Sequence, residues 1–410
     1  MGKTEKLLNT FAYFLESVIL FFLTFFIKRR RSYVAIGSWK GQRYADNSRY
    51  LAEYIVCNRP DLTVLWIGNK SIKKEVTEAL PTAKFLEKDR FRTNVALLRC
   101  KYMFFSQMHD ADISKYNVYR GAITCYLHHG MPIKKWGQDG LSQVISDDHG
   151  IRGFIKRVTG ANLHYDYFVT SSPPHDRTNC SGLTFKGCTG EKNIHSGTPR
   201  DDMYFRVNEQ IINETKKHYA GVLQFESAKR VIMYLPTYRR TSTNVFSFST
   251  LTKDEREKVL IILDRYNCIL IEKSHMAEKN TFAGQNSENQ IICAPSEMNV
   301  QEMMLFADYL ISDYSGAYLD YILLDRPVIH FAYDYDYYRN VDSGLYYEID
   351  DFAAGPIAYS FDELLKAMEE ALAGIDTYSE KREYVRKKYM TYEKGHASEQ
   401  IVDTVIGGAK

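Results

Sequence analysis

Short apolar runs that alternate with longer amphipathic stretches restrict the fold of this chain more than any other feature. Five runs read as buried parallel strands in the first half: Tyr33–Gly37, Thr63–Gly68, Tyr102–Ser106, Ala122–His129 and Tyr167–Ser171. Five more follow: Val231–Thr237, Cys268–Lys273, Gln290–Ala294, Tyr309–Ser312 and Pro327–Tyr333. Helical patterns such as Lys253–Arg265 and Phe361–Ala373 accompany them. The alternation predicts an α/β protein with two doubly wound sheets, in which ligand binds where the carboxyl ends of strands face a crevice.

The length of the chain supports two domains. It has 410 residues, well above the roughly 100–200 residues of one domain. The boundary is expected in the polar stretch at 206–228, and no low-complexity linker separates the halves, so they are expected to share one cleft. We therefore divide the chain into an N-terminal segment 1–31, a first domain 32–215 and a second domain 216–410.

Charge and cysteine content exclude several classes of protein. Lys and Arg number 53 against 51 Asp and Glu, a net charge of only +2, so nucleic acid is not expected as the main ligand. The seven cysteines have no C-x-x-C spacing. That pattern excludes a zinc ribbon and a dense disulfide framework, and it fits a reducing compartment.

The N-terminal segment is strongly apolar. As a helix, Leu7–Ile27 would reach roughly 31 Å, close to the thickness of a hydrocarbon core. Glu16 would be costly inside lipid, but Lys28-Arg29-Arg30-Arg31 follows directly, and such a cluster attracts anionic headgroups on the cytoplasmic face. We expect a membrane anchor, spanning or in-plane, with the rest of the chain on the cytoplasmic side. The alternative is a buried helix of the first domain.

The most unusual local sequence is Leu127–Asp139, which follows a predicted strand. A histidine at a strand end, such as His129, can act as a general base near neutral pH. Lys134 and Lys135 could steer an anionic substrate. The alternative, equally supported by the residues alone, is a histidine bonded to a backbone carbonyl beside two solvated lysines.

A second group of candidate residues lies in Ser312–Asp320, directly after another predicted strand. Ser315 and Gly316 at a helix start would present free backbone N–H groups to a phosphate. The alternative is an ordinary N-cap with Asp320 on a solvated helix face. The sequence contains no Walker A loop, no G-x-G-x-x-G and no H-E-x-x-H, so ATPase, NAD and zincin functions have no support. No metal site is predicted.

Several motifs, in order from about residue 33 to 395, resemble the CDP-glycerol:poly(glycerophosphate) glycerophosphotransferases of teichoic acid and related capsule synthesis. The family patterns YSDNPKYLYEYL, HGTPLKKLG, GYPRND, PTWR, TDYSS…D, RPI…YD and a late G-P correspond to Tyr44–Ile55, His129–Gly137, Gly197–Asp202, Pro236–Arg239, Ser312–Asp320, Arg326–Asp334 and Gly355-Pro356. Two positions depart from the pattern. The HGTP threonine is Met131, and the family's His-Pro is His275-Met276.

The resemblance implies a GT-B-like pair of Rossmann-type domains, with the acceptor bound in the first and a CDP-activated polyol in the second. An acceptor hydroxyl would attack the β-phosphorus, and CMP would leave. His129 would be the base, and Asp320 would contact a polyol hydroxyl or orient the donor. The residues expected to bind substrate are Lys134, Lys135, Arg200, Thr237, Arg239, His275, Ser312, Asp313, Ser315 and Gly316.

The expected function is a membrane-associated transferase that moves a polyol phosphate, glycerol phosphate first, to a lipid-linked or polymeric acceptor at the cytoplasmic side of the cell membrane. Mg²⁺ is an option as counterion of the donor pyrophosphate, although no protein cage for it is visible. Glycerol against ribitol, primase against polymerase, and assembly into homo-oligomers stay open. Two rivals are a GT-B glycosyltransferase that uses a nucleotide sugar and a non-catalytic membrane scaffold. Intact His129, Arg239, His275, Ser312 and Asp320 argue against the scaffold.

Overall fold

The computed structural model describes residues 3–140, 163–237, 239, 245–273 and 290–407. The first domain is built on a seven-stranded parallel sheet with the order β3-β2-β1-β4-β5-β6-β7. Its strands are β1 (Arg30–Gly37), β2 (Thr63–Gly68), β3 (Lys84–Glu87), β4 (Cys100–Phe105), β5 (Ile123–Tyr126), β6 (Tyr167–Val169) and β7 (Asn193–Ile194). The apolar runs became strands because both faces of this sheet are covered, as in other parallel sheets.

The second domain is built on a six-stranded parallel sheet with the order β10-β9-β8-β11-β12-β13. Its strands are β8 (Arg230–Leu235), β9 (Cys268–Glu272), β10 (Ile291–Cys293), β11 (Tyr309–Ser312), β12 (Val328–Phe331) and β13 (Ile357–Ala358). All ten predicted strands are present in the two sheets. The three unpredicted strands, β3, β7 and β13, are edge strands of two to four residues, too short for a periodic signal.

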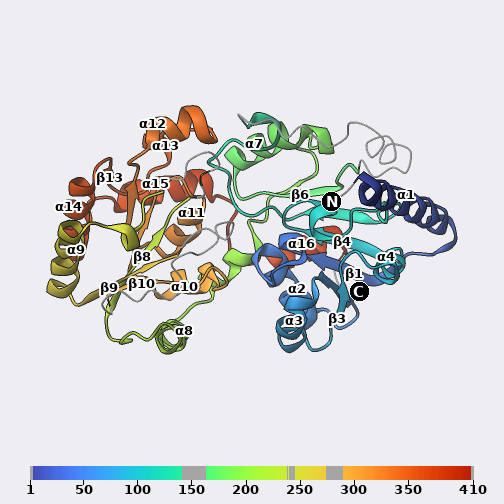
Figure 1. The fold of residues 1–410 in the computed structure, drawn as a ribbon, viewed down its shortest axis with the longest axis horizontal. Coiled ribbons are helices and arrows are strands. Elements are labelled where there is room, and N and C mark those ends of the chain that lie inside the picture. Colours follow the sequence, from blue (N-terminus) through green and yellow to red (C-terminus); the bar gives the residue numbers. More distant parts are fainter. Residues whose placement is uncertain (1–2, 141–162, 238, 240–244, 274–289, 408–410) are drawn as a thin grey trace.

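Helices cover both sheets (Figure 1). Those of the first domain are α2 (Asp46–Asn58), α3 (Lys73–Ala79), α4 (Phe91–Leu97), α5 (His109–Asp112) and α7 (Pro173–Leu183). The later helices are α8 (Glu209–Leu223), α9 (Lys253–Arg265), α10 (Val300–Phe306), α11 (Ala317–Tyr321), α12 (Tyr335–Tyr337), α13 (Ile349–Phe352), α14 (Phe361–Leu372), α15 (Ser379–Tyr389) and α16 (Ala397–Val405). Capping boxes at Thr252 and Ser360 begin α9 and α14, close to where the sequence predicted.

The domain limits differ from the expected ones at both ends of the second domain. A boundary at 215 would cut α8, whose Tyr219 and Leu223 belong to the core that covers the second sheet. At the other end, α16 returns to the first domain, where Ile401 and Val402 join the core of the first sheet. Asp202 caps the start of this helix by accepting from the backbone N–H groups of residues 397 and 398, at 2.7 and 2.9 Å. In Figure 1 the red α16 lies among the blue and cyan elements of the other domain.

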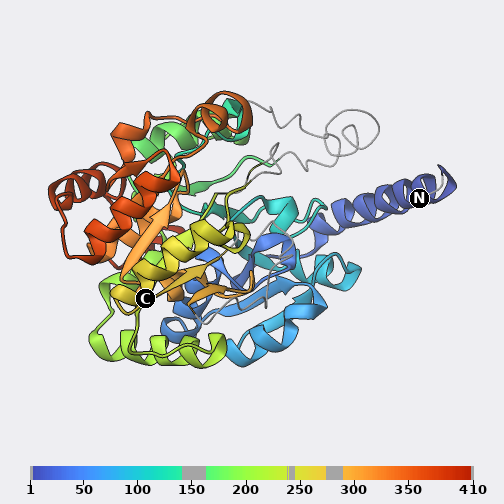
Figure 2. The same ribbon diagram turned by 60° about the vertical axis from the view of Figure 1, so that its left-hand side comes forward.

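The N-terminal helix α1 (Lys3–Phe26) projects from the first domain and is docked on it along one side (Figure 2). Leu20 is fully buried, and the Glu16 carboxylate accepts a hydrogen bond from Asn94 Nδ2 at 2.8 Å. By length and composition, Leu8–Phe26 could cross a membrane, and only 11% of that span is buried. The alternative of a buried core helix is therefore wrong.

The four basic residues after α1 differ in their contacts. The Arg29 guanidinium donates to the backbone carbonyls of Leu97, Cys100, Val118 and Arg120 at 2.5–3.2 Å. It therefore fixes the end of the helix to the sheet and is not available to lipid headgroups, contrary to the expectation for this residue. Lys28, Arg30 and Arg31 remain exposed.

Candidate active site

A cavity of about 950 Å³ lies between the two domains. Residues that follow the carboxyl ends of strands line it from both sides: Arg43–Asp46 after β1, His128–Trp136 after β5, Pro236 after β8, Lys273 after β9 and Ser315–Ala317 after β11. This is where open α/β sheets bind ligands. The shared cleft predicted from the sequence is therefore present.

His129 reaches the cleft through a turn that the sequence did not predict. β5 ends at Tyr126, so the predicted strand Ala122–His129 extends three residues too far at its carboxyl end. His128 has a left-handed φ of 59°, which buries its own side chain and leaves His129 exposed to the cavity. Asn47 holds the turn, because its Nδ2 donates to the carbonyls of Leu127 and His128 at 3.2 and 2.8 Å.

The surroundings of His129 favour its neutral form. Desolvation lowers the pKa of its imidazole below the ordinary 6.5, the positive charges of Arg200 and Lys134 lower it further, and Asp46 opposes them. A neutral imidazole can accept a proton at pH 7. His129 is therefore a candidate general base, and its imidazole also bonds to the backbone of Ser106, as the alternative predicted.

His128 has a structural position beside this base. Its ring stacks on His129 with a centroid distance of 4.8 Å and meets Trp136 and His175 edge-on at 4.7 Å. Desolvation lowers the pKa of His128 well below the ordinary value. The buried neutral ring thus forms a wall behind His129.

Lys134 and Lys135 line the cleft, as the sequence predicted, and their backbone also joins the domains. Lys134 forms an antiparallel bridge with Leu345, and the Lys135 N–H donates to the carbonyl of Gly344 at 3.0 Å. The loop after β5 is therefore fixed to the second domain as well as to the first.

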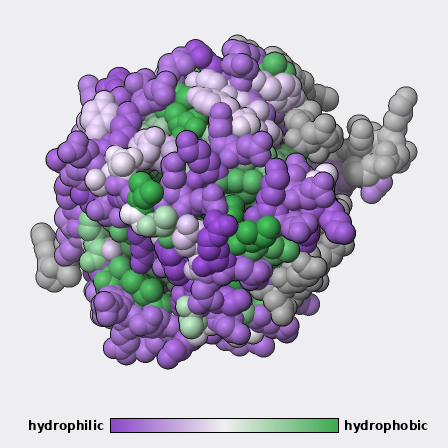
Figure 3. Space-filling view, turned by 90° about the vertical axis from the view of Figure 1, so that its left-hand side faces the viewer, coloured by the Kyte–Doolittle hydropathy of each residue, from purple (hydrophilic) through white to green (hydrophobic). Residues whose placement is uncertain are grey.

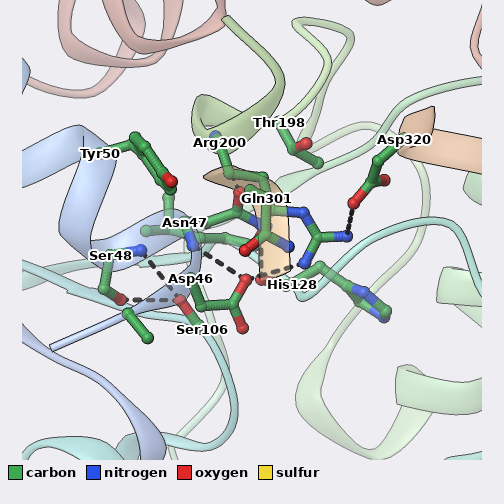
Figure 4. A network of polar contacts seen from close by, with 12 residues as sticks. Asp46, Asn47, Ser48, Tyr50, Ser106, His128, Thr198, Arg200, Gln301 and Asp320 are labelled. Carbon is green, nitrogen blue, oxygen red and sulfur yellow. Dashed lines mark hydrogen bonds and ion pairs between the residues drawn. The ribbon is translucent and has the colours of Figure 1, made fainter. Parts of the chain in front are cut away.

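Arg200 is a clamp between the domains (Figure 4). Its guanidinium pairs with Asp46 at 2.9 Å and with Asp320 at 2.8 Å, and all three side chains are almost fully buried. Gly130 makes room for it, because a Cβ there would lie 2.4 Å from Arg200 Nη2. Asp320 is held beneath Arg200 and does not line the cavity. The contact of Asp320 with substrate stays a prediction, and in the structure its carboxylate positions Arg200.

Four other predicted substrate-binding residues of the second domain form buried hydrogen bonds and ion pairs with other protein groups: Thr237, Arg239, Ser312 and Asp313. Asp313 accepts from the backbone N–H of Thr237 at 3.0 Å and from its hydroxyl at 2.6 Å. Arg239, whose side chain is fully buried, pairs with Asp313 and Asp334 at 2.8 Å. The hydroxyl of Ser312 donates to the carbonyl of residue 235. Among the described residues, none of the four lines the cavity. Their contact with the donor stays a prediction, and in the structure they hold β8, β11 and the loop after β12 together.

Ser315 and Gly316 do line the cavity. A Cβ on Gly316 would lie 2.8 Å from the carbonyl oxygen of Met131, so this glycine lets the β5 loop approach the second domain. The helix that follows, α11, has only five residues, which gives it a weaker dipole than expected for a phosphate seat. His275 lies outside the described residues.

Four residues of the cleft and its support were missed by sequence reasoning. Asp46 lines the cavity and Asn47 is buried beside it. Both belong to the Tyr44–Ile55 motif, which could have identified them, although their bonds to the β5 loop and Arg200 depend on the tertiary fold. Arg43 and Lys273 also line the cavity. Of these two, Lys273 carried a usable signal, because it lies at a predicted strand end.

Two parallel α/β domains that face one cleft are the arrangement of a GT-B-like protein with Rossmann-type domains. The sequence model of the CDP-Glycerol:Poly(glycerophosphate) glycerophosphotransferase family matches residues 19–407. The chain belongs to this family, and the resemblance, the fold class and the enzyme class predicted from the sequence are confirmed.

Known relatives extend over nearly the whole chain. A teichoic acid poly(glycerol phosphate) polymerase of Bacillus spizizenii is 22% identical over 406 residues, 95% of each protein. A teichoic acid glycerol-phosphate transferase of Staphylococcus aureus is 25% identical over 385 residues, 90% of this chain and 91% of the relative. The structure of the wall teichoic acid polymerase TagF has a TM-score of 0.73 at 22% identity, covering 92% of this chain and 89% of that one.

Proposed function

We propose that this protein transfers glycerol phosphate from CDP-glycerol to a hydroxyl group of a teichoic acid or related cell-surface acceptor, with release of CMP. The family and the two relatives support the reaction class and the donor. The observation that carries the proposal is His129, neutral and exposed in a cleft that both domains line.

The reaction is a substitution at phosphorus. The acceptor oxygen forms a bond to the β-phosphorus while the bond from that phosphorus to the bridging oxygen breaks, and CMP departs with the bridging oxygen. His129 takes the acceptor proton. Such chemistry depends mainly on alignment and on stabilising the charge of the phosphate oxygens. The cleft supplies backbone N–H groups at Ser315 and Gly316 and the ammonium groups of Lys134 and Lys135.

The donor side of the cleft is shaped by the buried network beneath it. Asp313 and Arg239 connect β11, which precedes the 315–317 turn, to the end of β8, and this connection supports the position of the turn. Mg²⁺ as counterion of the donor pyrophosphate stays a prediction. Within the described ranges, no group of three or more His, Cys, Asp or Glu side chains is placed to hold a metal ion.

The proposed contact with the membrane is made by helix α1, which would lie in the plane of the membrane. Most of its exposed large apolar residues are spaced three or four apart, as one helical face requires: Leu8, Phe11, Leu15, Ile19, Phe22 and Phe26. Phe14 and Phe25 are also exposed and widen this surface to one side. The opposite side is docked on the first domain, where Tyr13 stacks on Tyr116 at 5.2 Å. By contrast, the face of the second domain in Figure 3 is mostly hydrophilic, with hydrophobic residues in small separate patches. An in-plane helix would place the cleft beside a lipid-linked acceptor.

The function is tested by incubating the protein with a lipid-linked glycerol-phosphate acceptor and CDP-glycerol, CDP-ribitol or a UDP-sugar in parallel. We expect CMP from CDP-glycerol. CMP from CDP-ribitol alone would correct the polyol, and UDP release would replace the proposal with a glycosyltransferase. Product length then separates one transfer from polymerisation.

The membrane contact is tested by replacing exposed residues of α1, because deletion of residues 1–31 would also remove Arg29 and the start of β1. The triple variant Phe11→Ser, Phe22→Ser, Phe26→Ser should lose binding to anionic lipid vesicles while keeping turnover of a soluble acceptor. A control with Ser replacing three exposed aromatic residues elsewhere, Phe91, Phe185 and Phe205, should still bind. Equal vesicle binding by both variants would overturn the contact.

A further inference from the structure

Two cations, Arg43 from the first domain and Lys273 from the second, meet at one backbone carbonyl in the cleft. Arg43 Nη1 donates to the carbonyl oxygen of Ser296 at 2.7 Å, and Lys273 Nζ donates to the same oxygen at 3.1 Å. Both side chains line the cavity. The shared acceptor holds two positive charges close together, an arrangement that repulsion opposes unless an anion offsets it.

Within the part of the chain that the structure describes, no carboxylate forms an ion pair with Arg43 or Lys273. Among the described residues, neither Arg43 nor Lys273 has a carboxylate oxygen within ion-pair distance, whereas the arginines around them do: Arg49 pairs with Glu53 and Glu302, Arg200 with Asp46 and Asp320, and Arg239 with Asp313 and Asp334. Glu297 attracts both cations and Glu75 attracts Arg43, from beyond ion-pair distance.

Because Lys273 is buried, its charged form is costly without a nearby anion. Its residue is only 3% exposed, and a buried cation without a partner is strongly disfavoured. Desolvation and the charge of Arg43 lower the pKa of Lys273 to about 8. Lys has three N–H donors and Arg five, so most of the donors of this pair are not used by Ser296.

We propose that Arg43 and Lys273 form a phosphate subsite shared by the two domains. The subsite rests on the proposed function for its natural ligand, either the pyrophosphate of the donor or a phosphodiester of the acceptor chain. Since one cation comes from each domain, a bound phosphate joins the walls of the cleft and couples ligand binding to the arrangement of the domains.

The test measures equilibrium binding, without turnover, of inorganic pyrophosphate, CDP-glycerol and a soluble glycerol-phosphate oligomer. The variants are Lys273→Gln, Arg43→Gln and the double variant, with Lys258→Gln, whose side chain is exposed on α9, as the control. Loss of a charge-assisted bond should weaken binding about 10- to 100-fold. A loss for CDP-glycerol assigns the donor pyrophosphate, and a loss for the oligomer assigns the acceptor phosphodiester. Unchanged binding of all three ligands overturns the subsite.

Two further results separate a ligand role from a structural one. Lys273→Gln should not lower the unfolding temperature of the free protein, because it removes an uncompensated buried charge while Arg43 still donates to Ser296. The losses in the double variant should be smaller than the product of the single losses, because one phosphate contacts both residues. A destabilised variant with normal pyrophosphate affinity, or strictly multiplicative losses, would contradict the shared subsite. Since pyrophosphate binding needs no reaction, the subsite can hold even if no CMP is released.

Discussion

The two walls of the cleft use their polar motifs differently. In the first domain the loop after β5 extends His129, Lys134 and Lys135 to the cavity. In the second domain, Arg239 and Asp313 are paired beneath the surface, and of the Ser312–Asp320 motif only Ser315, Gly316 and Ala317 line the cleft. A motif can therefore mark residues that act on a ligand or residues that hold the backbone for those that do, and burial with satisfied partners distinguishes the two.

Of the substitutions that compare the two walls, His129→Ala is expected to have the largest effect. His129→Ala should lower CMP release about 10²- to 10⁴-fold through loss of the base, with CDP-glycerol affinity near that of the wild type. His128→Ala is the matched control, because its ring packs on Trp136 and His175 and its loss should lower stability. Normal turnover by His129→Ala would show that His129 is not the general base.

On the opposite wall, Arg239→Ala should act on stability. It leaves Asp313 and Asp334 without their partner, and breaking a buried pair costs about 3–5 kcal/mol. The free energy of unfolding in urea measures this loss. Arg239→Lys should restore only part of it, since lysine cannot form the two-pronged contact. If Arg239→Ala is as stable as the wild type but binds CDP-glycerol more weakly, Arg239 contacts the donor instead of supporting the fold.

The same network predicts a pH dependence of stability. His330 accepts from the Ala354 N–H through Nε2, at 3.0 Å, with its Nδ1 3.4 Å from the carbonyl of Asp313, and burial lowers its pKa to about 4. Between pH 6.5 and 4 the unfolded chain binds a proton at this site and the native chain does not. The resulting loss in the free energy of unfolding is absent above pH 6.5 and grows to about 3 kcal/mol as the pH falls to 4. His330→Gln should flatten the profile by that amount, and an unchanged slope would contradict the buried neutral ring.

A smaller effect tests the contact between the walls. Gly316→Ala would place a Cβ 2.8 Å from the carbonyl of Met131, and crowding of this kind costs about 1–3 kcal/mol. Gly221→Ala on α8 is the control, because nothing lies within 4 Å of its Cβ, and it should be neutral or slightly stabilising. Thermal unfolding compares them. Equal behaviour would show that the loop and the turn are not in contact.

The smallest effect is expected at Ser315, which faces the cleft and whose hydroxyl accepts only a weak bond from Ala317 N–H at 3.3 Å. Ser315→Ala removes one hydroxyl worth about 1 kcal/mol, so calorimetry should find CDP-glycerol bound only a few-fold more weakly. No change would leave the backbone N–H groups as the only contribution of this turn.

The sequence predicted the sheets well because a buried parallel strand is a continuous apolar run, a signal that depends on local composition. Thr63–Gly68, Tyr309–Ser312 and Lys253–Arg265 have the limits that it predicted. It failed for β7 and β13, which have two residues each, and for α16, whose place on the first domain is a long-range contact.

The site was predicted in part, for physical reasons. His129, Lys134 and Lys135 follow a strand end, and topology alone places such residues at the cleft. The roles of Arg239 and Asp320 could not be predicted, because a charged residue in a motif looks the same whether its partner is a phosphate or a buried ion. Arg43 was missed because its partner Ser296 is 253 residues away.

The central claim is that neutral His129 in the cleft takes the proton of the acceptor hydroxyl. The most direct measurement is the pH dependence of kcat/KM for CMP release from CDP-glycerol at a fixed soluble acceptor. Because the pKa of His129 is lowered below 6.5, we predict that the rate rises from acid pH and reaches a plateau before pH 7. A profile that is still rising well above pH 7, or one whose acid limb persists unchanged in the residual activity of His129→Gln, would contradict the claim.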